Sequence, residues 1–265
     1  ANGRFRTYEG LPGCDLDPIH VSDYHMQPYL MFFPNTIKNT IYTGWSQTQL
    51  CPGGVAGGSP TDWGKCDATT VANKSEGKIQ EWLGNWGWKD GRLVGPMDAV
   101  GGAPRKMADG ATIFALSTLA AYKHTGDTAF LDATFPHVAA ACRWQIAQVS
   151  VNGTLPSFWN TYDYMSLDGF DNVAYNAFAH LAGMRACGVI ADIVKDATGL
   201  AADANLSFAL VQRGLNSTLW TGRFWSVAAG VCRAAPGRPC LHPSWPWGNQ
   251  VMMSGSLHGQ SWASS

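Results

Sequence analysis

The feature that most constrains the fold is a succession of helical apolar patterns through the middle of the chain. Asp109 can start the first helix, which closes at Gly126, a natural C-terminal cap. Asp127 opens a second, short helix, and Pro136 is best placed in the first turn of a third. Two further patterns span roughly residues 171–193 and 202–215. Apolar residues in these segments recur at spacings of three and four, which defines one buried face per helix.

The remaining segments are less regular. Residues 19–42 are broken by Pro28 and Pro34, which predicts two short helices with a joint between them. Residues 78–104 carry three tryptophans among glycines without a clear period, and we expect an irregular functional loop there. Loops are also expected over residues 1–18, 51–66 and 222–250, and a helix-like pattern resumes over 251–263. Antiparallel helices joined by long polar loops, with few strands, predict an all-α toroid whose site lies in the loops at one end.

Composition excludes several classes of function. The apolar fraction is 46%, the charged fraction is 14% and the net charge is −1, so nucleic acid and anionic membranes are poor candidate partners. No apolar run approaches the ~20 residues of a membrane span. No glycine-rich dinucleotide loop follows a strand, and no Gly-x-Ser-x-Gly elbow is present. His20 and His25 are five residues apart, not four, so neither a metal nor another cofactor is expected.

Cysteines and sequons predict the compartment. Of seven cysteines, two pairs bracket glycine- and proline-rich loops and are the disulfide candidates: Cys51 with Cys66, and Cys232 with Cys240. The odd cysteine leaves one thiol free or bonded elsewhere. Four Asn-x-Ser/Thr sites are glycosylation candidates: Asn73, Asn152, Asn205 and Asn216. Together these features predict a secreted, lumenal or cell-surface glycoprotein.

The segment Ser157–Met165 holds the most chemistry. Asp163 lies there among four aromatic rings, at the entrance of a long helical pattern. A carboxyl group in such a setting can present a proton to a sugar. The alternative is that Asn160, Thr161 or Asp163 simply caps the helix. A second acid in a loop-like aromatic setting is Glu9, and glycosidic cleavage by the usual route needs two carboxyl groups.

These landmarks resemble the catalytic domain of glycoside hydrolase family 116, which includes bile-acid β-glucosidase. Tyr8-Glu9-Gly10 resembles the segment that holds the family's nucleophile. Pro18-Ile19-His20-Val21, leading to Phe32-Phe33-Pro34, resembles the helix entry beyond it. Asn160-Thr161-Tyr162-Asp163 followed by Ala174-Tyr175 resembles the loop that supplies the acid/base. The landmarks follow the family's order over nearly the whole chain.

The resemblance implies an (α/α)6 barrel and a retaining mechanism on β-glucosides or related β-linked sugars, with glycolipids among the substrates. Glu9 would attack the anomeric carbon, and Asp163 would protonate the leaving oxygen and then activate water. For that role Asp163 must hold its proton near neutral pH, which aromatic burial and the nearby Glu9 could both promote. The candidate substrate-binding residues are Thr161, His20, Asp98, Tyr162 and Trp159.

Two departures from the family bear on activity. His20 stands where the family usually has Asp, and either Asp17 or Asp23 could substitute for it. Met97 stands where the family commonly has a sugar-binding His, and methionine cannot hydrogen-bond a hydroxyl in the same way. An inactive relative with a structural or carbohydrate-binding role is therefore the alternative. A toroid with lyase or inverting chemistry is a third option.

The resemblance begins around the nucleophile, so residues 1–265 are expected to be part of a single (α/α)6 domain. The family's N-terminal β-sandwich and both ends of the barrel would lie outside them. A barrel lacking helices exposes apolar faces. We therefore expect the rest of the polypeptide, or neighbouring subunits, to complete it.

Overall fold

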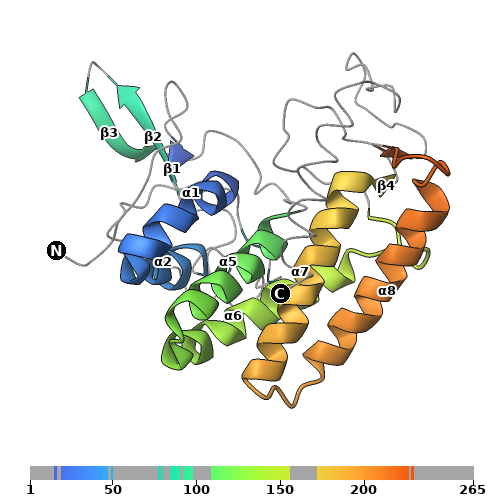
Figure 1. Ribbon diagram of the computed structural model, residues 1–265. Coiled ribbons are helices and arrows are strands. Elements are labelled where there is room, and N and C mark those ends of the chain that lie inside the picture. The colour runs from blue at the N-terminus through green and yellow to red at the C-terminus, as the bar shows by residue number, and fades with distance from the viewer. Residues whose placement is uncertain are drawn as a thin grey trace, which may run out of the picture.

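The computed structural model describes residues 15–16, 19–46, 49, 77, 79, 84–89, 92–97, 109–155, 172–226 and 228–229. These residues form six α-helices, one π-helical turn and five short strands (Figure 1). The helices are α1 (Ile19–Phe32), α2 (Pro34–Thr40), α5 (Gly110–Thr125), α6 (Thr128–Ala147), α7 (Ala174–Ile193) and α8 (Leu200–Thr218), with η1 (Ile41–Trp45) as the π-helical turn. The strands are β1 (Asp15–Leu16), β2 (Gly84–Lys89), β3 (Arg92–Met97), β4 (Asn172–Val173) and β5 (Ala228–Ala229). The described part is mostly helical, as the sequence predicts.

The two N-terminal helices meet at Phe33, which confirms the predicted joint. Pro34 takes the first position of α2, where its missing N–H costs no helical hydrogen bond. Pro28 lies inside α1 rather than at its end. Lys38 of α2 forms an ion pair with Asp127 at 2.5 Å. The hydrogen bond from Lys38, with a second from the Phe130 N–H, holds the pKa of the Asp127 carboxyl below its usual value.

A three-stranded antiparallel sheet in the order β1-β2-β3 includes residues 84–89 and 92–97, which lie within the irregular loop expected over residues 78–104. Lys89 pairs with Arg92, so two residues connect β2 to β3. Those residues are Asp90-Gly91, a dipeptide that is favoured in two-residue hairpin loops. The expectation of a loop was wrong because the glycines and tryptophans obscured this turn signal.

Helix α5 is the centre of the described part. Every residue from Gly110 to Ala121 is buried, and the helix packs against α1, α2, α6 and α7. A helix buried on all sides belongs to the interior of a fold. Its boundaries agree with the sequence: Asp109 is the N-cap residue, and Gly126 ends the helix in the left-handed conformation with a φ of 66°.

Helix α6 is one continuous helix rather than the two that were expected. Asp127 caps it by accepting a hydrogen bond from the Phe130 N–H at 2.9 Å. Pro136 lies inside the helix and is exposed. Pro136 has no N–H to donate to the carbonyl of Asp132, four residues earlier. Asp132 is also an exposed residue. Buried residues on both sides of Pro136 hold the two halves against the core, and this packing outweighs a proline cost of roughly 3 kcal/mol.

Helices α7 and α8 form an antiparallel pair, close to the predicted segments. Helix α8 is amphipathic, with one buried face. Its buried residues are Leu200, Ala204, Ser207, Val211, Gly214 and Leu215. Its opposite face is exposed. Helix α7 is buried over most of its circumference because α5, α6 and α8 all pack against it.

Helices α5 and α7 approach each other closely at Gly183. A Cβ atom added there would lie 2.5 Å from the Cβ of Thr112 on α5. Only a residue without a side chain allows the two backbones to come this near. The contact fixes α5 and α7 side by side, and α6 and α8 pack on them as the partners of two helical hairpins (Figure 1).

The connections differ in length at the two ends of these hairpins. At one end, Gly126 and Asp127 join α5 to α6, and residues 194–199 join α7 to α8. At the other end, residues 148–173 join α6 to α7. In Figure 1 α7 begins, and α8 ends, on the upper side, where the connection over residues 148–173 reaches α7. We refer to this side as the loop end. The hairpins agree with the predicted all-α class, whereas closure into a toroid stays a prediction.

A buried disulfide joins α6 to α7. Cys142 and Cys187 are each 1% exposed and their Cα atoms are 6.2 Å apart. Both had been expected only as inward apolar positions. The four cysteines predicted to form disulfides, Cys51, Cys66, Cys232 and Cys240, lie outside the described residues.

We expect loss of this disulfide to destabilise the protein markedly. It closes a loop with a sequence separation of 45 residues, and the chain-entropy model gives about 4 kcal/mol for a loop of that size. Urea unfolding of the Cys142→Ala/Cys187→Ala variant, beside oxidised and reduced wild type, measures the effect. An unfolding free energy that does not change on reduction would contradict this expectation.

A pair of glycine substitutions on α7 tests the helix contact. Gly183→Ala should lower the unfolding free energy by about 1–3 kcal/mol, because the new methyl group overlaps Thr112. Gly188→Ala is the matched control on the same helix, since its nearest neighbour would be Asn205 Oδ1 at 4.0 Å. The control should be neutral, or stabilising by up to about 1 kcal/mol from helix propensity. Thermal unfolding of both variants distinguishes a packing effect from a general intolerance of alanine.

Candidate functional site

Most of the predicted site residues lie outside the described residues. These are Glu9, Asp98, Trp159, Thr161, Tyr162 and Asp163. His20 is the second residue of α1, and its backbone alone is described. Met97 is the last residue of β3, so Asp98 directly follows the sheet. The structure therefore describes the residues that flank the segments carrying Asp98 and Asp163.

The segment 156–171, which carries Asp163, begins and ends at adjacent points of the loop end. The Leu155 N–H donates to Asn172 Oδ1 at 3.5 Å, a long hydrogen bond. Asn172 Nδ2 in turn donates to Thr218 Oγ1 of α8 at 2.7 Å. Asn172 is 2% exposed and pairs with Ala229 in the two-stranded β4–β5 sheet. One buried amide thus fixes both ends of the segment to the end of α8.

The N-cap residue of α7 is Val173, which makes no capping side-chain bond. It lies ten positions after Asp163 in the sequence. The helix-cap explanation of Asn160, Thr161 and Asp163 is therefore wrong, because none of them occupies the N-cap position.

A buried carboxyl–phenol pair joins the starts of α5 and α7. The Tyr175 hydroxyl donates to Asp109 Oδ2 at 2.9 Å, and the two residues are 6% and 0% exposed. Asp109 ends the segment that carries Asp98, and Tyr175 closely follows the segment that carries Asp163. The pair therefore ties together the attachment points of two segments that hold predicted site residues.

Aromatic side chains gather near the end of α8. The rings of Trp220 and Trp225 are 4.8 Å apart, and Phe178 of α7 meets Trp225 edge-on at 5.7 Å. Thr221 stabilises the turn between the two tryptophans by hydrogen bonds with Phe224. Trp220 remains 44% exposed and Phe224 50% exposed. Exposed indole and phenyl rings on a hydrogen-bonded turn can contact the apolar face of a sugar.

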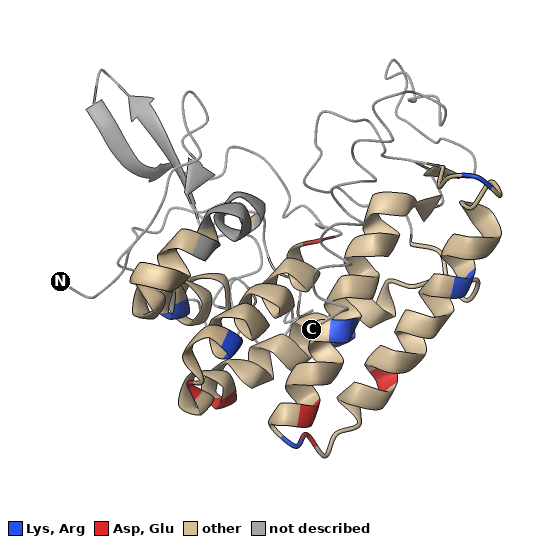
Figure 2. Cartoon of the chain, viewed as in Figure 1, with Lys and Arg blue, Asp and Glu red and all other residues tan. Residues whose placement is uncertain are grey.

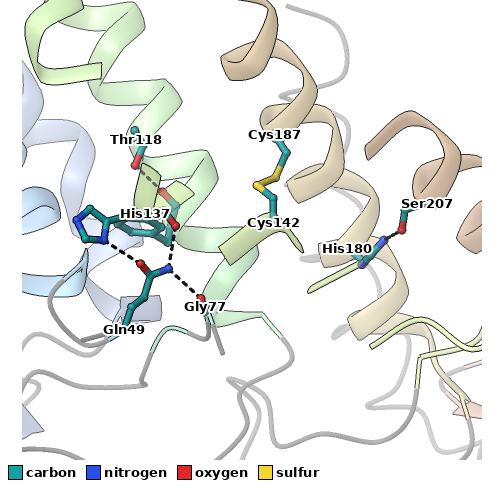
Figure 3. The surroundings of a disulfide bond; sticks show 9 residues. Gln49, Gly77, Thr118, His137, Cys142, His180, Cys187 and Ser207 are labelled. Carbon is teal, nitrogen blue, oxygen red and sulfur yellow. Dashed lines mark hydrogen bonds between the residues drawn. A yellow bond between two sulfur atoms is a disulfide. The ribbon is translucent and has the colours of Figure 1, made fainter. Parts of the chain in front are cut away.

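His180 forms a buried polar contact between α7 and α8. Its Nε2 is 2.9 Å from Ser207 Oγ (Figure 3). The ring is fully buried, and burial lowers the pKa of His180 to about 3. Among the described residues, no hydrogen-bond partner reaches its Nδ1. His180 is therefore neutral near pH 7.

Gln49 forms a second polar contact, on the other side of the disulfide (Figure 3). Its amide nitrogen donates to the carbonyls of Gly77 and His137, and its amide oxygen is 2.9 Å from His137 Nδ1. Burial lowers the pKa of the His137 ring. These hydrogen bonds hold residue 77 against α6, so we assign Gln49 a structural role.

Charged residues are sparse in the described part, and the two signs are interspersed in Figure 2. No group of three His, Cys, Asp or Glu side chains in that part is placed to hold a metal ion. None of the helices described is long and apolar enough to span a membrane. Three sequon asparagines, Asn152, Asn205 and Asn216, are exposed, whereas Asn73 lies outside the described residues.

Sequence reasoning did not identify Asn172, or the pairing of Asp109 with Tyr175. Asp109 had been interpreted only as a helix start, and Tyr175 only as part of a family landmark. A signal was present, since a polar residue at the start of a helix that is apolar throughout has to find a buried partner. Which partner it finds depends on how α5 and α7 pack.

Comparisons with known proteins give limited guidance. No family model and no curated protein matches the chain. Among solved structures, a rhamnosidase from Klebsiella oxytoca with rhamnose bound is similar, with a TM-score of 0.41 and 12% identity. The match covers 71% of this chain, and this chain spans 35% of the length of the rhamnosidase. A likeness at this level leaves the function to be argued from the chain's own residues, and membership of glycoside hydrolase family 116 stays a prediction.

The buried ring of His180 should make stability depend on pH. The unfolded chain takes up a proton at this histidine below pH 6.5, whereas the native protein does so only near pH 3. The unfolding free energy should therefore fall as the pH falls between those values, by about 1.4 kcal/mol per pH unit from this group. Urea unfolding at pH 6.5, 5.5 and 4.5 measures the slope, which His180→Gln should reduce by that amount.

Ser207→Ala is the matched control for this prediction. It removes the hydroxyl next to His180 but keeps the ring buried between α7 and α8. Because burial is the cause of the lowered pKa, the pH slope should persist in this variant. Equal slopes in wild type and His180→Gln would refute the assignment.

Proposed function

We propose that the protein is a retaining glycoside hydrolase that acts on β-glucosides or related β-linked sugars, with glucosylceramide-like lipids among the candidate substrates. Glu9 is the proposed nucleophile and Asp163 the proposed acid/base. Thr161, His20, Asp98, Tyr162 and Trp159 are the proposed sugar contacts. The proposal includes membership of glycoside hydrolase family 116 and an (α/α)6 barrel completed by further chain or subunits.

The observation that carries the proposal is the shared attachment of the site-bearing segments. Asn172 fixes both ends of segment 156–171, and the Tyr175–Asp109 hydrogen bond joins its far end to the segment after β3. The segment with the proposed acid/base Asp163 and the segment with the proposed sugar contact Asp98 thus meet the helices at neighbouring points. In a fold of helical hairpins the long connections at one end are suited to build a site, because the helices hold their attachment points rigidly.

The aromatic rings near the end of α8 support a saccharide ligand. Trp220 and Phe224 are exposed beside the strand pair in which Asn172 lies. A sugar or an apolar aglycone bound beyond the scissile bond could rest on these rings. No cofactor is needed for this chemistry, since two carboxyl groups suffice for double displacement.

A secreted, lumenal or cell-surface location is part of the same proposal. The buried Cys142–Cys187 disulfide supports it, because structural disulfides persist mainly in oxidising compartments. The exposed sequons at Asn152, Asn205 and Asn216 support it independently.

The alternative function is an inactive, carbohydrate-binding relative. The departures at His20 and Met97 favour it, because both change side chains that the resemblance places against the sugar. The two functions differ in turnover and agree in sugar binding, so one experiment separates them.

Aryl β-glucosides and β-xylosides, incubated with full-length protein, test the proposal. Asp163→Asn should reduce turnover by a factor of about 10² or more, since a positioned acid or base contributes on that scale. Glu9→Gln should reduce turnover by at least as much, because it removes the nucleophile that forms the glycosyl-enzyme intermediate. Asp168→Asn, which changes an acid in the same segment, is the matched control and should retain activity. Retention of the β-configuration in the first-formed product supports double displacement.

Sugar binding without turnover on any substrate would favour the inactive relative. Inverted or unsaturated products would indicate a different mechanism. Full activity in Asp163→Asn would refute the assigned acid/base.

A further inference from the structure

Two predicted glycosylation sites lie on the same exposed face of α8. Asn205 and Asn216 are both exposed, and they are 11 positions apart in a continuous helix. At 100° per residue they differ by about 20° around the axis and are separated by about 16 Å along it. A third sequon, at Asn152, is exposed in the turn between residues 150 and 154.

The hydroxyl groups of the two helical sequons are engaged in the folded protein. Ser207, which completes the sequon of Asn205, is 5% exposed and its Oγ is 2.9 Å from His180 Nε2. Thr218, which completes the sequon of Asn216, donates to the Gly214 carbonyl at 2.6 Å and accepts from Asn172 at 2.7 Å. The Ser207 hydroxyl is therefore inaccessible to an enzyme that approaches from solvent, whereas Thr218 is exposed at the last position of α8 with its hydroxyl already hydrogen-bonded.

Helical geometry separates the two parts of each sequon. Residues i and i+2 of a helix lie about 200° apart around the axis, on opposite faces. An extended chain instead places them on one side. A transferase that reads the asparagine and the hydroxyl residue together therefore requires a non-helical chain. Folded α8 does not meet that requirement at either site.

We propose that Asn205 and Asn216 carry N-linked glycans that are attached before α8 forms. A lipid-linked oligosaccharide diphosphate is the donor. The asparagine Nδ2 bonds to C1 of the first sugar, the bond from C1 to the diphosphate oxygen breaks, and the amide loses one proton to a base of the transferase. When α8 then folds, both glycans project into solvent from one face, Ser207 is buried beside His180, and the Thr218 hydroxyl bonds to Gly214 and Asn172.

The disulfide provides independent support. Cys142–Cys187 is buried between α6 and α7, and the compartment that permits such a bond is the one that holds the transferase and its donor. The inference does not depend on the proposed hydrolase activity. Its consequence is that the outward face of α8 stays clear of other subunits, because two glycans about 16 Å apart would cover it.

Glycan mapping of the full-length protein from a secreting eukaryotic host tests occupancy. Enzymatic release of the glycans in ¹⁸O-water converts each occupied asparagine to labelled aspartate, which mass spectrometry locates. We expect label at Asn205 and Asn216. Asn205→Gln replaces an exposed side chain. It should remove one glycan and leave the glycan of Asn216 in place. Secreted protein that lacks label at Asn205 or at Asn216 would overturn the proposal.

The order of events is tested with full-length chain made without glycans in bacteria. Native oxidised protein and reduced, alkylated protein are each incubated with purified oligosaccharyltransferase and lipid-linked donor. The alkylated chain, which cannot form Cys142–Cys187, should be modified at Asn205 and Asn216, and the native protein at neither. Asn152, whose sequon lies in a turn, is the internal comparison. Modification of native protein at Asn205 or Asn216 would overturn the order that we propose.

Discussion

The close packing of α5 against α7 is the constraint on which the described structure depends. Gly183 allows the two backbones to approach at Thr112, and α1, α2 and α6 cover the other sides of α5, so that its residues from Gly110 to Ala121 are buried. The contact sets α5 and α7 side by side, so the hydroxyl of Tyr175 reaches the carboxyl of Asp109. The disulfide between Cys142 and Cys187 then fixes α6 to the same core. A bulkier residue at position 183 would push α5 away from α7 and would disturb the Tyr175–Asp109 contact at the same time.

This packing decides where chemistry can be located. Tight turns close the hairpins at one end, and the connections at the other end are long enough to carry functional groups. Asn172 is the residue that links the two properties: it is buried, and it holds Leu155 and Thr218 at once. We propose that the hydrolase site is built at this loop end, and the aromatic rings near Trp220 lie there as well, next to the end of α8. The proposed glycan-bearing face of α8 is instead set by which side of that helix packs on α7.

Local signals in the sequence were reliable where a single residue determines backbone geometry. Gly126 and Asp127 mark helix ends in both the sequence and the structure, because these caps act within one turn. Asp109 occupies the N-cap position of α5 as expected, but its side chain makes no capping hydrogen bond and instead accepts from the Tyr175 hydroxyl. Pro136 misled, since packing on both of its sides outweighs its local cost. The β2–β3 hairpin was missed although Asp90-Gly91 indicated it. The candidate acids Glu9 and Asp163 rest on sequence motifs, which the described residues do not test.

The sequence by itself determined the helical class, both ends of α5, the start of α6 and the positions of sequons and candidate acids, because these depend on short-range patterns. Only the tertiary structure decided which cysteines pair, that His180 meets Ser207, and that Asp109 meets Tyr175. Each of these contacts joins residues at least 27 positions apart, and no periodicity within one helix encodes its partner on another. The partner is selected when apolar faces pack and buried polar groups must find hydrogen bonds.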